Sequence, residues 1–142
     1  MTSGKLVTVL AAAVVSLLLY ACSPAIGYEC FIKEGDSEGN LYSFTVPFDD
    51  SLATYSVSFF TRIDAPGDKA PEKALGLDVT WTSPSGESAG ETVYMDPSKE
   101  VETYRSGVVP GETGDWKIEV RVQDAPQGFR GLGIMIRTDG TR

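Results

Sequence analysis

The chain has 142 residues and a formal net charge of −8, from 20 acidic and 12 basic side chains. This acidity argues against binding nucleic acid or an anionic lipid surface, because both need clustered lysine and arginine. The chain also has no histidine, which excludes Ser-His-Asp and Cys-His catalysis and histidine-ligated zinc. Composition therefore predicts a protein that is not an enzyme, with no cofactor and no metal.

The N-terminal residues have the pattern of a bacterial lipoprotein signal. Lys5 precedes an apolar run over residues 6–19, which is shorter than the roughly 20 residues that span a bilayer. The run ends in Leu19-Tyr20-Ala21-Cys22, which resembles a lipobox, where a leucine and a small residue precede a lipid-bearing cysteine. We therefore predict a signal peptide over residues 1–21 and lipidation of Cys22, with the lipid bilayer as a partner. Plain secretion and an uncleaved anchor are the alternatives.

The chain has two cysteines, Cys22 and Cys30. If Cys22 carries lipid, Cys30 is a single thiol, and such a cysteine usually behaves as a small buried apolar residue. We therefore expect Cys30 in the core. A Cys22–Cys30 disulfide is the alternative, and it requires that Cys22 carries no lipid.

After a short tether over residues 22–28, the pattern is that of one β domain over residues 29–142. Apolar and polar residues alternate in short segments that are separated by Gly, Pro, Asn and Asp, and no later segment has helical spacing. The predicted strands are 29–33, 41–48, 54–62, 75–82, 91–95, 101–105, 116–123 and 131–138. Seven or eight such strands predict an antiparallel β-sandwich, either jelly-roll or immunoglobulin-like.

Aromatic residues lie in register with the apolar face of these strands. The expected core aromatics are Phe44, Tyr55, Phe59, Trp81 and Trp116. Both tryptophans alternate in step with aliphatic neighbours, so we expect them in the core rather than on a sugar-binding surface. Tyr28, Tyr94 and Tyr104 belong less clearly to a core face, and Tyr20 lies in the signal. The strand that contains Pro47 is the expected sheet edge, because proline cannot donate a ladder hydrogen bond.

Two groups of polar residues are candidate sites. The candidate carboxylates for glycoside hydrolysis are Asp49, Asp50, Asp96 and Asp124; all lie in predicted turns, where such side chains usually bond to local backbone. Residues 36–40 are rich in oxygen ligands, but they lack the spacing of a calcium-binding EF-hand loop. We therefore predict a solvated turn at 36–40 and assign no catalytic, cofactor or metal residue.

Several segments together resemble the gliding-motility lipoprotein family GldH. They are the lipobox cysteine, Tyr42–Val46 with Asp49-Asp50, the strand 55–62, the turn 83–86, and the pair 114–120 and 129–137. The resemblance implies a lipid-anchored accessory protein of gliding and its secretion machinery, and it implies no catalytic or ligand residue. Ser23 follows the cysteine and no acidic run comes next, which favours an outer-membrane anchor that faces the periplasm.

The sequence therefore predicts a non-catalytic lipoprotein that acts by contact with envelope proteins, through the edge strand around residues 42–47. The alternative is a carbohydrate-binding module of a glycan uptake system. The two hypotheses differ in where aromatic side chains lie, because a sugar-stacking platform needs at least two exposed and coplanar rings.

Overall fold

The computed structural model describes residues 26–64 and 73–141. These residues form eight strands and one short 3-10 helix. The elements are β1 Ile26–Lys33, η1 Glu34–Asp36, β2 Leu41–Phe48, β3 Ala53–Ile63, β4 Leu75–Thr82, β5 Ser88–Met95, β6 Val101–Val108, β7 Gly114–Gln123 and β8 Phe129–Thr141. The fold is an all-β antiparallel sandwich, as predicted. Because η1 has three residues, no helix in the described ranges is long enough to cross a membrane.

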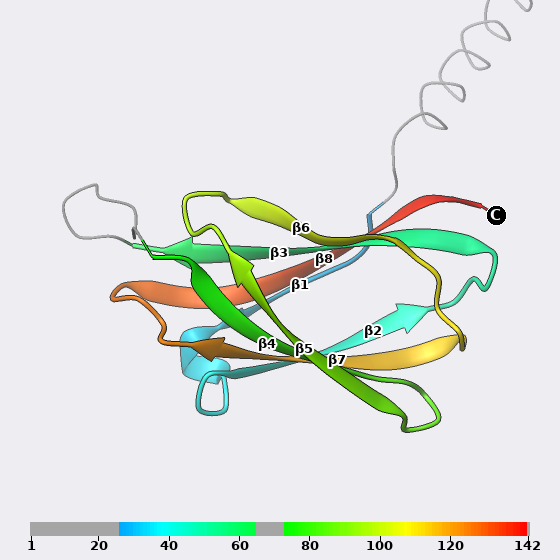
Figure 1. Cartoon of the computed structure of the whole chain (residues 1–142), viewed down its shortest axis with the longest axis horizontal. Coiled ribbons are helices and arrows are strands. Elements are labelled where there is room, and N and C mark those ends of the chain that lie inside the picture. Colours follow the sequence, from blue (N-terminus) through cyan, green and yellow to red (C-terminus); the bar gives the residue numbers. More distant parts are fainter. Residues whose placement is uncertain (1–25, 65–72, 142) are drawn as a thin grey trace, which may run out of the picture.

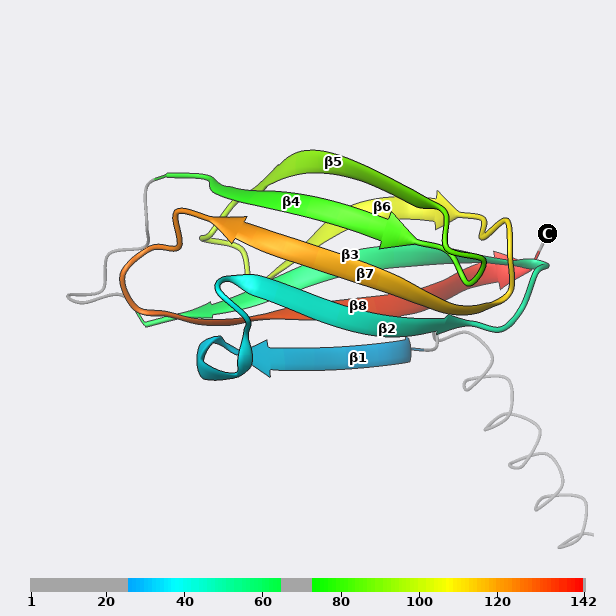
Figure 2. The same cartoon turned by 90° about the horizontal axis from the view of Figure 1, so that it is seen from below.

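The strands form two four-stranded sheets (Figure 1). Sheet A has the order β1-β8-β3-β6, and sheet B has the order β2-β7-β4-β5. Within the described ranges, every connection except β4–β5 crosses from one sheet to the other. This order, with eight strands in two Greek keys, is that of a jelly roll and not that of an immunoglobulin domain. Figure 2 shows sheet B in front, with β2 at one edge and β5 at the other.

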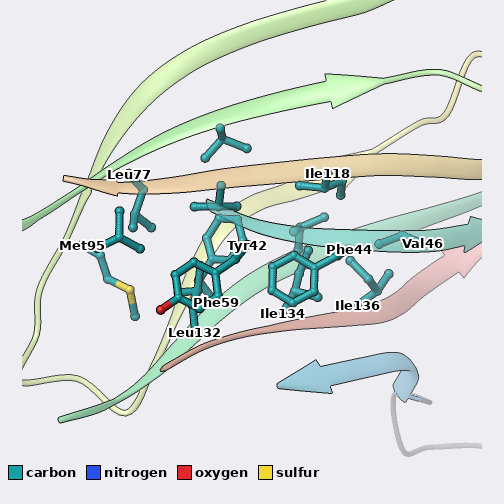
Figure 3. Close-up of a cluster of buried hydrophobic side chains, with 14 of the residues drawn as sticks. Tyr42, Phe44, Val46, Phe59, Leu77, Met95, Ile118, Leu132, Ile134 and Ile136 are labelled. Atoms are coloured by element: carbon teal, nitrogen blue, oxygen red, sulfur yellow. The ribbon is translucent and has the colours of Figure 1, made fainter. Parts of the chain in front are cut away.

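The core fills the space between the sheets (Figure 3). Alternate side chains of each strand point to the same face of the sheet, so the apolar half of each alternating segment lies inside. The largest fully buried side chains include Tyr42, Phe44, Phe59, Leu77, Ile118, Leu132, Ile134 and Ile136. Each contributes about 1.5–3 kcal/mol by removal of its apolar surface from water. Of the aromatic residues expected in the core, Phe44, Tyr55 and Phe59 are buried, as predicted.

Six strands, β1, β3, β5, β6, β7 and β8, are longer than the sequence suggested, and two of these extensions change the interpretation. β1 begins at Ile26, so residues 26–28, which were expected in the tether, belong to a strand that pairs with β8. β5 begins at Ser88 rather than at Glu91, and it pairs with β4 along its whole length. Ladder hydrogen bonds come from the backbone, so a strand continues through small residues of low β propensity when its partner continues beside it. The predicted lipidation site Cys22 lies outside the described residues.

Two further predictions can be checked at the sheet edges. β2, with Pro47, is an edge strand of sheet B, as predicted. Cys30 is a free thiol, but it is half-buried rather than buried. Cys30 packs against the core as expected, but its predicted full burial was wrong, because β1 is the outermost strand of sheet A and the core there is covered from one side only.

Candidate functional site

An open cleft lies between the two edge strands β5 and β6, at the end of the sandwich where β4 and β6 finish. Its volume is about 470 Å³. Trp81, Trp116 and Phe48 form its aromatic floor, while Glu91 of β5 and Arg105 of β6 lie on its walls. We call this site the aromatic cleft. Its volume falls within the range of about 300–1,000 Å³ that is typical of small-molecule sites.

The cleft is open because the row of side chains that includes Trp81 becomes smaller toward the edge of sheet B. Cross-strand pairing places Phe44, Ile118, Trp81 and Ala89 side by side on the inner face. Phe44 and Ile118 are fully buried, whereas at the edge only the methyl group of Ala89 is available to cover Trp81. Trp81 and Trp116 are therefore half-buried against the core. The prediction that both tryptophans point to the inner face was correct. The prediction that they are fully buried was wrong.

The opposite wall of the cleft is irregular. The pairing of β6 with β3 shifts near Val57, and Gly107 on β6 has a φ of 64°, a conformation that suits glycine. A register shift of this kind bends the strand. In Figure 1, β5 and β6 diverge from their connecting turn toward the end of the sandwich that holds the cleft. Ser106 and Gly107 line the cleft, so this wall also lacks a large side chain to cover the indoles.

The polar edge of each indole already has a hydrogen-bond partner in the protein. Trp81 Nε1 donates to the Tyr104 hydroxyl at 3.3 Å, and Trp116 Nε1 donates to the Glu112 carbonyl at 2.9 Å. These bonds fix the orientation of both rings through the Nε1 atoms at their edges and do not involve the ring faces. The indole faces in the cleft are thus rigidly held and available for apolar contact.

A charged network continues from Trp81 along the cleft wall. The Tyr104 hydroxyl donates to Glu91 Oε1, and Arg105 donates to the same oxygen from Nε at 3.0 Å and from Nη2. Arg105 also lies 5.4 Å from the centre of the Tyr104 ring. Within the described ranges, Glu91 Oε2 and Arg105 Nη1 have no partner, so one acceptor and one donor remain free beside the aromatic floor.

The network fixes the charge state of the cleft. Hydrogen bonds from Tyr104 and Arg105 lower the pKa of Glu91, so this carboxylate is ionised at neutral pH. Burial raises the pKa of Tyr104, which keeps its hydroxyl protonated. Hydrogen bonds with Tyr104 and Glu91 raise the pKa of Arg105. The cleft therefore presents a fixed carboxylate and a fixed guanidinium over a wide pH range.

The floor of the cleft is folded rather than flat. The rings of Trp81 and Trp116 are 6.2 Å apart and inclined at 79°, whereas Phe48 lies nearly parallel to Trp81, at 9° and 6.3 Å. A ligand therefore meets two indole surfaces at about a right angle. Such a corner suits a compact ring with apolar faces and polar edges.

The residues that sequence analysis weighed for chemistry are not in the cleft. Asp50 Oδ1 accepts from the Leu52 amide at 2.9 Å, and Asp96 Oδ1 accepts from the Ser98 amide at 2.9 Å. These local bonds confirm their interpretation as turn residues. Asp124 lies 3.9 Å from an exposed lysine ammonium, that of Lys73. In the described part of the chain, no three metal-ligating side chains come together, at residues 36–40 or elsewhere.

Sequence analysis missed the polar wall of the cleft. Glu91 and Arg105 were placed at the end of short predicted strands, with no reason to expect them to meet. Tyr104 was noted only as a tyrosine without a clear core face. The available signal was the Ser88-Ala89-Gly90 segment, because a strand of such small residues beside a tryptophan leaves that tryptophan uncovered.

Comparison with known proteins gives little further information. No family model matches the chain, and no curated protein matches it. Among solved structures, the chain is similar to TmCBM61, a carbohydrate-binding module in complex with beta-1,4-galactotriose. The match has 19% identity and a TM-score of 0.31, and it covers 77% of this chain but only 64% of that one. At this TM-score, the match carries no weight for the fold or the ligand of this chain.

Proposed function

We propose that the protein is a non-catalytic carbohydrate-binding lipoprotein of the bacterial envelope, and that the aromatic cleft is its sugar-binding site. The observation that carries this proposal is the pair of half-buried indoles, Trp81 and Trp116. Their N–H groups are bonded within the protein, while their faces line an open cleft. This arrangement differs from a closed core, in which other side chains would cover the ring faces.

The chemistry of the cleft matches that of a pyranose ring. The C–H faces of a sugar are apolar and pack on aromatic faces, whereas its hydroxyl groups need partners at the ring edge. Glu91 Oε2 can accept a hydrogen bond from one hydroxyl, and Arg105 Nη1 can donate to another. Hydrogen bonds to charged groups are worth about 1.5–3 kcal/mol, so these two atoms would orient the ligand.

Lipidation of Cys22 would place the cleft near the membrane. β1 begins at Ile26, at the same end of the sandwich as the cleft (Figure 1). Only three residues lie between Cys22 and Ile26, so the two residues are at most about 14 Å apart when the chain is extended. The cleft would then bind glycan close to the membrane surface, in agreement with the predicted outer-membrane anchor that faces the periplasm.

The test is a glycan array of neutral oligosaccharides, followed by calorimetric titration of the best ligand with the full chain in detergent. We expect Trp81→Ala to weaken binding by about tenfold or more, which corresponds to about 1.4 kcal/mol. Tyr94→Ala is the matched control, since Tyr94 is 70% exposed and lies outside the cleft. Equal binding by the Trp81→Ala variant, or no array binding at all, would contradict the proposal.

Action by protein contact is the second candidate function, and the position of β2 favours it. β2 is an edge strand, and the exposed backbone of an edge strand can pair with a partner's strand. Crosslinking in intact cells from Ser43 or Thr45, the exposed residues of β2, should then recover one envelope protein. Recovery of none would exclude contact through β2. Membership of the GldH family stays a prediction.

A further inference from the structure

The outer face of sheet A carries two rows of residues that are not part of the proposed sugar-binding cleft. In one row, Phe31 of β1 and Phe60 of β3 flank Gly133 of β8. In the next row, Lys33 and Arg62 flank Gly131. We call Phe31 and Phe60 the phenylalanine platform. Phe60 lies toward the end of β3, whereas the cleft residue Val108 pairs with Tyr55 near the start of β3, and the platform shares no residue with the cleft.

The two rings lie flat on β8. A Cβ atom at Gly133 would overlap Cζ, Cε1 and Cε2 of Phe60 at nearly equal distances, so the face of the ring covers this glycine. A Cβ atom at Gly131 would come within 2.7 Å of Phe31 Cζ, so the tip of the second ring lies close to this glycine.

The rings of Phe31 and Phe60 lie side by side. Their centres are 5.8 Å apart and their planes differ by 19°. Phe31 is 38% exposed, and Phe60 is half-buried. The two rings are therefore nearly parallel and stacked with an offset, and their exposed parts form one aromatic surface.

Positive charge lies at one end of the platform. Lys33 and Arg62 are exposed, and they lie about 10 Å apart across β8, or two strand spacings. Neither forms an ion pair with any described residue, whereas Arg130 close by bonds to Asp64 at 2.8 Å. A hollow of about 400 Å³ lies beside Phe31, and its charged wall residues are three cations, Lys33, Arg62 and Arg130, and two carboxylates, Glu34 and Asp64. Two free cations are therefore close together on a chain whose net charge is −8.

We propose that the platform is a second binding site, specific for an acidic polysaccharide of equatorially linked pyranose rings that carry carboxylates. Equatorial linkages give a flat, ribbon-like sugar chain, whose apolar C–H faces can pack on the exposed part of the two parallel phenyl rings. The carboxylate would lie in the hollow between Lys33 and Arg62. Glu29 lies on the other side of the Phe31 row and would repel a ligand carboxylate. This repulsion would fix the direction in which the polysaccharide lies on the platform. This site does not depend on the function of the aromatic cleft.

The test compares two oligomers that differ only in charge: a β-1,4-linked glucose hexamer and the same hexamer with its C6 groups oxidised to carboxylates. Calorimetric titration uses the full chain in detergent. We expect binding of the oxidised hexamer at least about tenfold tighter than that of the neutral one, with affinity that falls as salt is raised. No binding of the oxidised hexamer, or equal binding of the two, would overturn the proposal.

Substitutions assign the binding to the platform. Lys33→Gln with Arg62→Gln should reduce the affinity for the oxidised hexamer to that for the neutral one. Phe60→Leu should weaken both, because leucine still covers Gly133 but offers no flat face. Trp81→Ala, in the cleft, should bind the oxidised hexamer like the wild type. If Trp81→Ala abolishes this binding, or if the Lys33/Arg62 variant retains it, the platform is not the site.

Discussion

The aromatic cleft and the phenylalanine platform expose aromatic rings by opposite routes. Trp81 points inward with the core residues of its strand, and it is uncovered because its neighbour at the sheet edge is only Ala89. Phe60 points outward, and its ring lies flat because Gly133 beneath it has no side chain. In both places the exposed surface is created by a small residue on the neighbouring strand.

This comparison shows why alternation alone is a poor guide to exposed aromatic surface. Alternation assigns each side chain to the inner or outer face of a sheet, but cover comes from the cross-strand neighbours. A tryptophan that points inward can be more accessible to a ligand than a tyrosine that points outward, if the neighbouring residue at the sheet edge is small. The four predictions below test this dependence on neighbours.

The largest expected effect is a gradient of stability along the row from Phe44 to Trp81. Phe44→Ala should reduce the free energy of unfolding by about 3–5 kcal/mol, since it leaves a cavity in a closed core. Trp81→Ala should cost only about 1–3 kcal/mol, because one face of the ring already meets solvent. Urea unfolding of both variants measures the difference. An equal loss would mean that Trp81 is a core residue and that the cleft is closed in solution.

Gly133→Val should cost about 1–3 kcal/mol, because its side chain displaces the Phe60 ring. In a Phe60→Ala background the same substitution should cost at least about 0.5 kcal/mol less, and a double-mutant cycle of urea unfolding measures this coupling. Gly35→Ala is the control: nothing lies within 4 Å of its added methyl group, so it should be nearly neutral. Additive costs for Gly133→Val and Phe60→Ala would mean that the ring does not rest on Gly133.

Ala89→Leu should change stability by no more than about 1 kcal/mol, since the cleft has room for the larger side chain. It should nevertheless cover Trp81 and abolish ligand binding to the cleft. Acrylamide quenching of tryptophan fluorescence should fall, while Ala89→Ser should behave like the wild type in both measurements. Unchanged quenching in the leucine variant would show that position 89 does not control access to Trp81.

The smallest expected effect is a pH dependence of stability that arises in the cleft. The folded-state pKa of Glu91 is lowered, so its contribution to stability is complete above its ordinary value of 4.5 and is lost as pH falls through the folded pKa. The difference in stability between wild type and Glu91→Gln should therefore shrink below pH 4.5. Denaturation curves at pH 7 and pH 3 measure it. A difference that is constant with pH would contradict the ionised network.

The sequence was sufficient to predict the sandwich and most of its strands, because each strand carries its own alternating pattern. For β2 and β4, even the bounds agree with the prediction, 41–48 and 75–82. The choice of jelly roll over immunoglobulin fold was not accessible, since strand order depends on pairings between segments far apart in the chain. The same limit hid both candidate sites. The Glu91–Arg105 pair and the Phe31–Gly133–Phe60 row each exist only after separate strands are aligned.

The position of β8 in sheet A has a consequence for when the protein can fold. β8 lies between β1 and β3, so neither of these two early strands can pair with it until residues 129–141 are available. Because synthesis begins at the N-terminus, sheet A cannot be completed until β8 has been synthesised. Pairing of the first strand with the last gives a high contact order, which slows folding. Sheet A stays incomplete until β8 has been synthesised, and loss of this thirteen-residue strand would leave β1 and β3 without their shared partner.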